Sequence, residues 1–240
     1  MSKFEIRAGV FYVVVFTLVL CSQTFAQSAV PESGFLDDYS KLKPAPEGVP
    51  GFIFEVESGE AGMAILGSYD SLMVDQPAIV LAPDSKKGLK PDEQKLIADA
   101  YRMALITALE RGERRLVTSP GPNTLYFRPG LTNLYLKKKR VKLVQFTPIG
   151  LVATVATSPF RDVMDKVNLL EATFEAELID SQTGKVLGAV VVPAGMHDSK
   201  KDQTSWKEFD ALLNATATRL GCRLNNSKRT PDQRVDCFAQ

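Results

Sequence analysis

Histidine is almost absent from this chain of 240 residues, which contains only His197. A catalytic triad needs a histidine between a nucleophile and an orienting carboxylate, and a histidine-based zinc site needs further ligands at suitable spacing. Asp198 adjoins the histidine, yet the sequence contains no GxSxG nucleophile motif. We interpret His197 as a surface loop residue, and we expect a protein that is not an enzyme and that holds no metal.

Phosphate-binding motifs and an excess of charge are also lacking. The glycine-rich stretches at residues 59–62 and 121–123 match neither GxxxxGK[ST] nor GxGxxG, and we interpret both as turns. The formal net charge is +1, so the chain has no overall bias toward nucleic acid. We therefore expect no cofactor and no nucleic-acid partner.

Long apolar runs are lacking, apart from one near the N-terminus. The run Val10 to Leu20 is shorter than the roughly 20 residues that span a bilayer, and Lys3 and Arg7 precede it. Small residues follow it. This pattern is typical of a signal peptide over residues 1–26. It predicts an exported protein that is periplasmic or associated with the outer membrane.

Cysteine is scarce, with three residues in the chain. If Cys21 leaves with the signal peptide, Cys222 and Cys237 remain, and an even pair in an exported protein predicts a disulfide. Two free thiols are the alternative. In a second interpretation of the N-terminus, Cys21 carries a lipid, although Leu20 is bulkier than the small residue that normally precedes a lipidated cysteine.

The rest of the chain divides into a linker, a domain and a tail. Residues 27–50 are a proline-containing linker in which Ser33 to Pro44 has apolar residues at the spacing of a docking segment. Residues 51–224 are expected to form the folded domain. Residues 225–240 are a polar tail that the disulfide would hold in place.

Two helices and several strands are expected in the domain. One amphipathic helix begins at Pro91 and ends near Gly112, and a second begins with a capping box at Ser205 and ends at Gly221. Strands are expected at 52–56, 69–83 with an edge position or a bulge at Pro77, 115–119, 123–139 with an interruption at Pro129-Gly130, and 168–193 as a hairpin. This order predicts a single α+β domain, with a mostly antiparallel sheet and the two main helices packed on one face.

The first arm of the hairpin alternates between apolar and polar residues. Ala172, Phe174, Ala176 and Leu178 point to one face, and Glu171, Thr173, Glu175 and Glu177 point to the other. We interpret the glutamate face as solvated. A carboxylate site for a metal or for acid–base chemistry is the alternative.

Four separated motifs, in order, carry a family resemblance. They are SGFLDDYSKLKP, PDEQKLIADAYRMALITALERG, PGPNTLYFRPGLTNLYL and EATFEAELIDSQTGKVLGAVVV, and together they span about residues 33–224. They resemble the bacterial family catalogued as domain of unknown function 3313, which comprises exported proteins and lipoproteins. The resemblance implies a place in the cell envelope and no particular chemistry. The element order is also similar to the small α/β domain of envelope lipoproteins that assist secretion and polysaccharide export, a likeness of fold alone.

A basic run and an apolar segment are the candidate contact surfaces. Lys137, Lys138, Lys139 and Arg140 end the long strand, and they fit either an anionic lipid or polysaccharide or simply a charged strand end that blocks edge pairing. The segment 143–160 follows, with Phe146 and Ile149 among its apolar residues. It either packs over the sheet or presents an apolar patch to a membrane or a partner.

These patterns favour a non-enzymatic cell-envelope protein. The first hypothesis is an accessory or scaffold protein that acts through contacts with envelope proteins or through self-association. The second is a module that binds an envelope saccharide or lipid. A third, an enzyme that uses the glutamate face, is the least favoured by the sequence.

Overall fold

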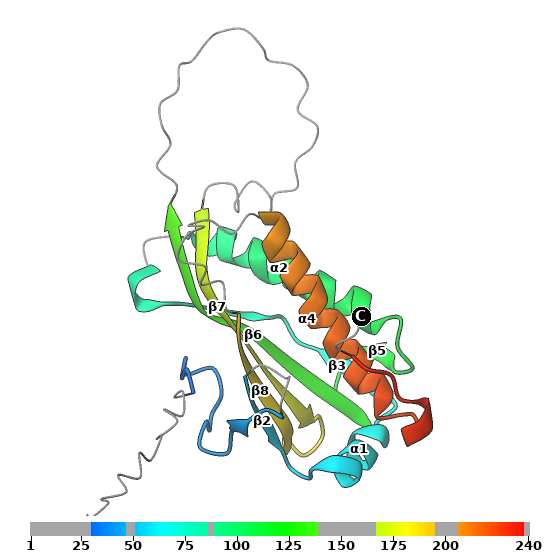
Figure 1. Cartoon of the computed structure of the whole chain (residues 1–240). Helices are drawn as coiled ribbons and strands as arrows, with labels where there is room; N and C mark the ends of the chain where they lie inside the picture. Colours follow the sequence, from blue (N-terminus) through cyan, green and yellow to red (C-terminus); the bar gives the residue numbers. More distant parts are fainter. Residues whose placement is uncertain (1–29, 47–50, 86–88, 139–166, 195–205, 238–240) are drawn as a thin grey trace, which may run out of the picture.

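The computed structural model describes residues 30–46, 51–85, 89–138, 167–194 and 206–237 (Figure 1). One sheet of eight strands has the order β1-β2-β8-β7-β6-β3-β5, with β4 also paired to β6. The strands are β1 (Lys43–Pro44), β2 (Phe52–Glu55), β3 (Ser71–Val74), β4 (Ala78–Leu81), β5 (Arg115–Val117), β6 (Thr124–Lys138), β7 (Val167–Asp180) and β8 (Val186–Ala194).

Within the described residues, three α-helices accompany the sheet: α1 (Gly59–Gly67), α2 (Pro91–Leu109) and α4 (Trp206–Asn226). Short 3-10 helices lie at Pro83–Ser85 and Pro231–Gln233. The strand pairings from β1 through β2, β8 and β7 to β6 are antiparallel, whereas β3 and β4 pair with β6 in parallel, and so does β5 with β3. The mostly antiparallel sheet with helices agrees with the expected α+β class. None of the helices in the described part of the chain is long and apolar enough to cross a bilayer.

Strand β6 is continuous, so the expected interruption at Pro129-Gly130 is wrong. The ladder with β3 ends at Phe127 and the ladder with β4 begins at Gly130. Pro129 therefore lies between two neighbours on that side of β6, where pairing changes partner and a missing amide hydrogen does least harm. The single strand expected over residues 69–83 is wrong as well, because Pro77 lies between two strands, β3 and β4, rather than at an edge position or a bulge of one strand.

Glycines misled the sequence interpretation at two helices. Residues 59–62, expected to form a turn, begin α1, and Gly221, expected to end the last helix, lies inside α4. A Cβ at Gly62 would lie 2.1 Å from the carbonyl oxygen of Glu57, and a Cβ at Gly221 would lie 3.2 Å from that of Ala108 in α2. These glycines allow close backbone approach rather than a turn. The capping box at Ser205 lies outside the described residues.

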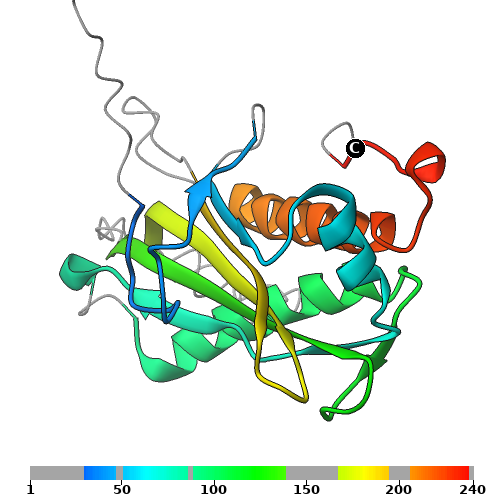
Figure 2. The ribbon, with the colours of Figure 1, turned by 90° about the horizontal axis from the view of Figure 1, so that it is seen from below.

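The main core joins the sheet to both long helices. Helices α2 and α4 run alongside one another (Figure 2). Tyr101 of α2 meets Phe174 of β7 edge-on, with ring centroids 5.6 Å apart. The same cluster includes Ile97, Leu105, Leu125, Phe127, Leu131, Phe209 and Leu213. That both helices pack on one face of the sheet stays a prediction, which this shared cluster supports.

The chain before β2 forms a second, smaller layer. We call residues 30–46 the arm. Its Leu36 and Leu42 are buried with Phe52 of β2 and Val191 of β8, and Phe35 and Tyr39 pack beside them. Because Val191 belongs to the sheet, the arm covers sheet surface that would otherwise meet water, and this burial contributes roughly 1.5–3 kcal/mol for each fully buried leucine.

The expected disulfide between Cys222 and Cys237 is confirmed, with the two Cα atoms 5.6 Å apart. It joins α4 to the tail, in which Asn226 and Val235 also exchange two hydrogen bonds.

Candidate functional site

The basic run is only partly within the described residues. Lys137 and Lys138 end β6, where they pair with Asn168 and Val167 of β7. Lys139, Arg140, Phe146 and Ile149 lie outside the described residues, as do Cys21 and His197.

The glutamates of β7 are the clearest correction to the sequence interpretation. Glu175 is 0% exposed and Glu177 is 5% exposed, so the expected solvated face is wrong at both positions. Thr173 is buried as well, and only Glu171 is exposed. The alternation itself holds, because Ala172, Phe174 and Ala176 join the main core. The polar face is buried because the arm lies on it.

Glu175 fixes the arm to the sheet. The hydroxyl of Tyr39 donates to its Oε2 at 2.6 Å, and the hydroxyl of Thr132, on neighbouring β6, donates to its Oε1. The Tyr39 oxygen in turn accepts amide hydrogens from Phe35 at 3.1 Å and Leu36 at 3.2 Å. One carboxylate thus orients a tyrosine that organises the whole turn of the arm.

Glu177 forms the second polar contact under the arm. Its Oε2 lies 2.6 Å from Nη2 of Arg128, which also donates to the carbonyl oxygen of Phe35 at 3.0 Å. The guanidinium lies 4.7 Å from the centre of the Phe35 ring, a cation–π distance. Burial raises the pKa of Glu177 above its usual value, while the charge of Arg128 opposes that rise.

A glycine makes room for this contact. A Cβ at Gly130 of β6 would lie 2.9 Å from the Phe35 ring, so a larger residue would push the arm away. Under the arm, then, both carboxylates have fixed partners from β6 or the arm itself. This geometry stabilises the fold and offers a substrate no open carboxylate.

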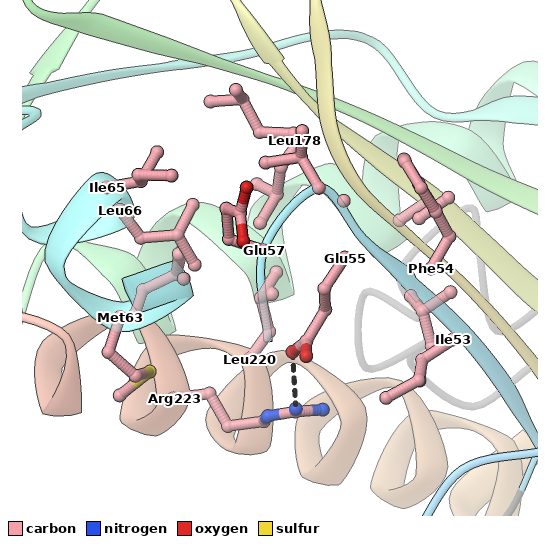
Figure 3. A pocket seen from close by; sticks show the side chains of 18 of the residues that line it. Ile53, Phe54, Glu55, Glu57, Met63, Ile65, Leu66, Leu178, Leu220 and Arg223 are labelled. Carbon is pink, nitrogen blue, oxygen red and sulfur yellow. Dashed lines mark ion pairs between the residues drawn. The ribbon is translucent and has the colours of Figure 1, made fainter. Parts of the chain in front are cut away.

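An open cavity lies elsewhere, between the sheet, α1 and α4 (Figure 3). Its volume is about 120 Å³. Mostly apolar residues line it, among them Ile53 and Phe54 of β2, Met63 and Leu66 of α1, Phe127 of β6, Ala176 and Leu178 of β7, Leu187 and Ala189 of β8, and Leu220 of α4.

Charged side chains meet at the wall of this cavity. Glu55 of β2 and Arg223 of α4 form an ion pair with an N–O distance of 3.9 Å, marked by the dashed line in Figure 3. Glu57 belongs to the same lining. The cavity therefore combines an apolar interior with two carboxylates and one guanidinium.

Helix α1 covers the cavity although none of its residues is fully buried. Polar contacts at its two ends hold it. Arg234 of the disulfide-linked tail donates from Nη2 to Glu60 at 2.8 Å, and Arg114 donates from Nη2 to the carbonyl oxygen of Leu66 at 2.6 Å. Arg114 is itself buried, and burial lowers its pKa.

Sequence reasoning missed both this cavity and Arg114. The cavity depends on a helix in a stretch interpreted as a turn, and Arg114 gave no signal beyond being one more basic residue. In the described ranges, no group of three or more His, Cys, Asp or Glu side chains is placed to hold a metal ion.

Comparison with solved structures gives weak similarities. One is to the PelC dodecamer from Paraburkholderia phytofirmans in its L103M form, with a TM-score of 0.37 and 12% identity over 66% of this chain and 88% of that chain. Another is to a neuraminyllactose-binding hemagglutinin homolog from Helicobacter pylori, with a TM-score of 0.31 and 8% identity over 68% of this chain and 85% of that chain. At these scores the likeness supports no inference about function.

No curated protein matches the chain. A family model, described as a protein of unknown function (DUF3313), matches residues 31–220. This range includes the arm except its first residue, the whole sheet and most of α4. The chain therefore belongs to the DUF3313 family.

Proposed function

We propose that this protein is an exported, non-enzymatic component of the bacterial cell envelope that acts as an accessory or scaffold protein through protein contacts. The observation that carries the proposal is the use of Glu175 and Glu177. They belong to the cluster that the sequence offered for acid–base chemistry, together with the exposed Glu171, and both are buried under the arm with fixed partners. Their roles are structural, which leaves binding as the better-supported activity.

The arm also supports the proposal. It begins only a few residues after the expected signal peptide and is fixed to the sheet by Tyr39 and Leu36. Because the arm is fixed to the sheet, only a short stretch of chain separates the domain from the expected signal peptide and from Cys21. If Cys21 carries a lipid, the domain lies next to the membrane. If cleavage precedes Gln27, the domain is free in the periplasm.

The contact surface in this proposal is the segment that follows β6, with Phe146 and Ile149. A photo-crosslinking residue placed at either position in the full chain, expressed in a bacterial host, should yield a defined covalent product with an envelope protein or with a second copy. Met103, which is 60% exposed on α2, is the matched control position and should yield none.

Two results would contradict this proposal. One is a strictly monomeric protein, by size-exclusion chromatography with light scattering, that gives no product from Phe146 or Ile149. The other is an intact N-terminus on protein that stays in the cytoplasm. The mass of the N-terminal peptide also separates a lipidated Cys21 from a start near Gln27.

A further inference from the structure

The cavity under α1 has a floor of small residues. Ala176 of β7 points into it from the same side of the strand as Leu178, and Gly188 of β8 lies opposite Leu178. A larger residue at position 176 would fill this space, as the side chain of Leu178 does two residues further along the same face of the strand. Because Phe127 and Leu220 close the remaining sides, the interior is apolar.

The volume of the cavity limits what it can hold. An apolar cavity of about 150 Å³ admits benzene, which has six carbon atoms. At about 120 Å³ this cavity has room for an apolar group of similar or slightly smaller size. A full lipid chain is too long to be enclosed here, whereas a branched aliphatic side chain fits.

The charges limit the ligand further. A purely anionic group would meet Glu55 and Glu57, and a purely cationic group would meet Arg223. The existing pair between Glu55 and Arg223 is long, at 3.9 Å, and both side chains are more than 40% exposed. Exposed pairs of this kind contribute roughly 0–1 kcal/mol, so a ligand that offers both charges can replace the pair at little cost.

We propose that this cavity binds a small zwitterion with an apolar body of about four to six carbon atoms, of the class of free aliphatic amino acids. The apolar body occupies the space above Ala176. The ammonium group lies toward Glu55 and Glu57, and the carboxylate lies toward Arg223. This inference goes beyond the proposed function, because it holds whether or not the protein also contacts other proteins.

Calorimetric titration of the purified protein with leucine, alanine and tryptophan tests the size of the site. Each methylene buried contributes about 0.8 kcal/mol, so leucine should bind about sixty-fold more tightly than alanine. Tryptophan should bind more weakly than leucine because its indole exceeds the cavity. Equal binding of leucine and alanine, or no binding of leucine, would overturn the proposal.

Two analogues of leucine test the charges. 3-Methylbutylamine lacks the carboxylate and 4-methylpentanoate lacks the ammonium group, and each should bind at least about ten-fold more weakly than leucine, since a hydrogen bond to a charged group contributes about 1.5–3 kcal/mol. Binding of either analogue as tight as that of leucine would overturn the zwitterion assignment.

Variants locate the site. Ala176→Leu should fill the cavity and weaken leucine binding at least about ten-fold, the equivalent of two lost methylenes. Arg223→Gln, at a position whose side chain is 45% exposed, should abolish the difference in affinity between leucine and 3-methylbutylamine. Arg111→Gln, the same change at an exposed site outside the cavity lining, should leave that difference intact. Unchanged leucine binding in both Ala176→Leu and Arg223→Gln would place the ligand elsewhere and contradict the proposal.

This experiment is separable from the test of the proposed function. The titration uses purified protein and needs no envelope partner, whereas the crosslinking needs no amino acid. A failure of either therefore leaves the other interpretable.

Discussion

Between Ala172 and Glu177 both faces of β7 are buried, but their burial depends on different chemistry. Phe174 points into an apolar core shared with α2 and α4, and Glu175, the next residue, points into a polar network under the arm. Apolar packing tolerates small shifts because it is non-directional. A buried carboxylate needs its specific partners, because an unsatisfied one is costly. The first face should therefore set overall stability, and the second should fix one arrangement of the arm.

The largest effect is expected on the apolar face. Phe174→Ala should lower the free energy of unfolding by about 3–5 kcal/mol through the cavity it leaves against Tyr101. Urea denaturation measures this loss. Met103→Ala, at an exposed position, should change stability by about 0.5 kcal/mol or less. Equal losses in the two variants would contradict the assignment of the core.

A smaller loss is expected on the polar face. Arg128→Met keeps the apolar stem but removes the partner of Glu177, leaving a buried carboxylate without its counterion. Removing one partner of a buried pair costs about 3–5 kcal/mol, and the partial exposure of Arg128 favours the lower end. Arg111→Met is the control with the same change of charge. If both variants unfold at the same urea concentration as the wild type, the pair has no structural role.

Glu177, on the polar face, should also make the stability of the protein depend on pH. Burial raises the pKa of Glu177 in the folded state above its ordinary value of 4.5. The folded state then holds the proton more tightly than the unfolded state, so stability decreases as pH rises from about 4.5 through the raised pKa. Glu177→Gln should lack this decrease.

Urea midpoints between about pH 4 and pH 8 provide the comparison for Glu177. The lowered pKa of Asp180, about 2, acts in the opposite sense and begins to lower stability below about pH 5. This contribution is the same in the wild type and in Glu177→Gln, so it cancels from the difference between their stability curves. Parallel stability curves for the wild type and Glu177→Gln would contradict the burial of this carboxylate.

The smallest effect on the fold is expected where neither face is involved. Changing Lys137, Lys138 and Lys139 to glutamine should leave the unfolding free energy within about 0.5 kcal/mol of the wild type. If the basic run binds anionic lipid, the same variant should lose about 1 kcal/mol of vesicle affinity for each lysine at low salt. The matched control changes Lys43, Lys95 and Lys185. Equal vesicle binding by both triple variants would exclude the basic run as a lipid site.

Sequence reasoning went furthest where local pattern decides the structure. The stripe of Ile97, Tyr101 and Leu105 predicted α2, the alternation around Phe174 predicted β7, and two cysteines in an exported chain predicted the disulfide. These features depend on residues close in sequence or on chemistry that one residue type dictates.

Sequence reasoning failed where contacts between residues that are distant in sequence decide the structure. Glu175 looks solvated in its own strand, because its partner Tyr39 lies 136 residues away. Gly221 looks like a turn residue, because the carbonyl group that approaches it belongs to Ala108, which is distant in sequence. The cavity with Arg223 was missed for the same reason, since four strands and two helices from separate parts of the chain line it.

The central claim is that Glu175 and Tyr39 hold the arm on the polar face of the sheet. Hydrogen exchange of the full chain, followed by mass spectrometry, tests it through peptides that cover residues 30–46. In the wild type these amides should be protected. In Tyr39→Phe, which loses the hydroxyl that joins Glu175 to the amides of Phe35 and Leu36, they should exchange much faster, while peptides of α2 stay protected. Rapid exchange of residues 30–46 in the wild type, or unchanged protection in Tyr39→Phe, would contradict the account.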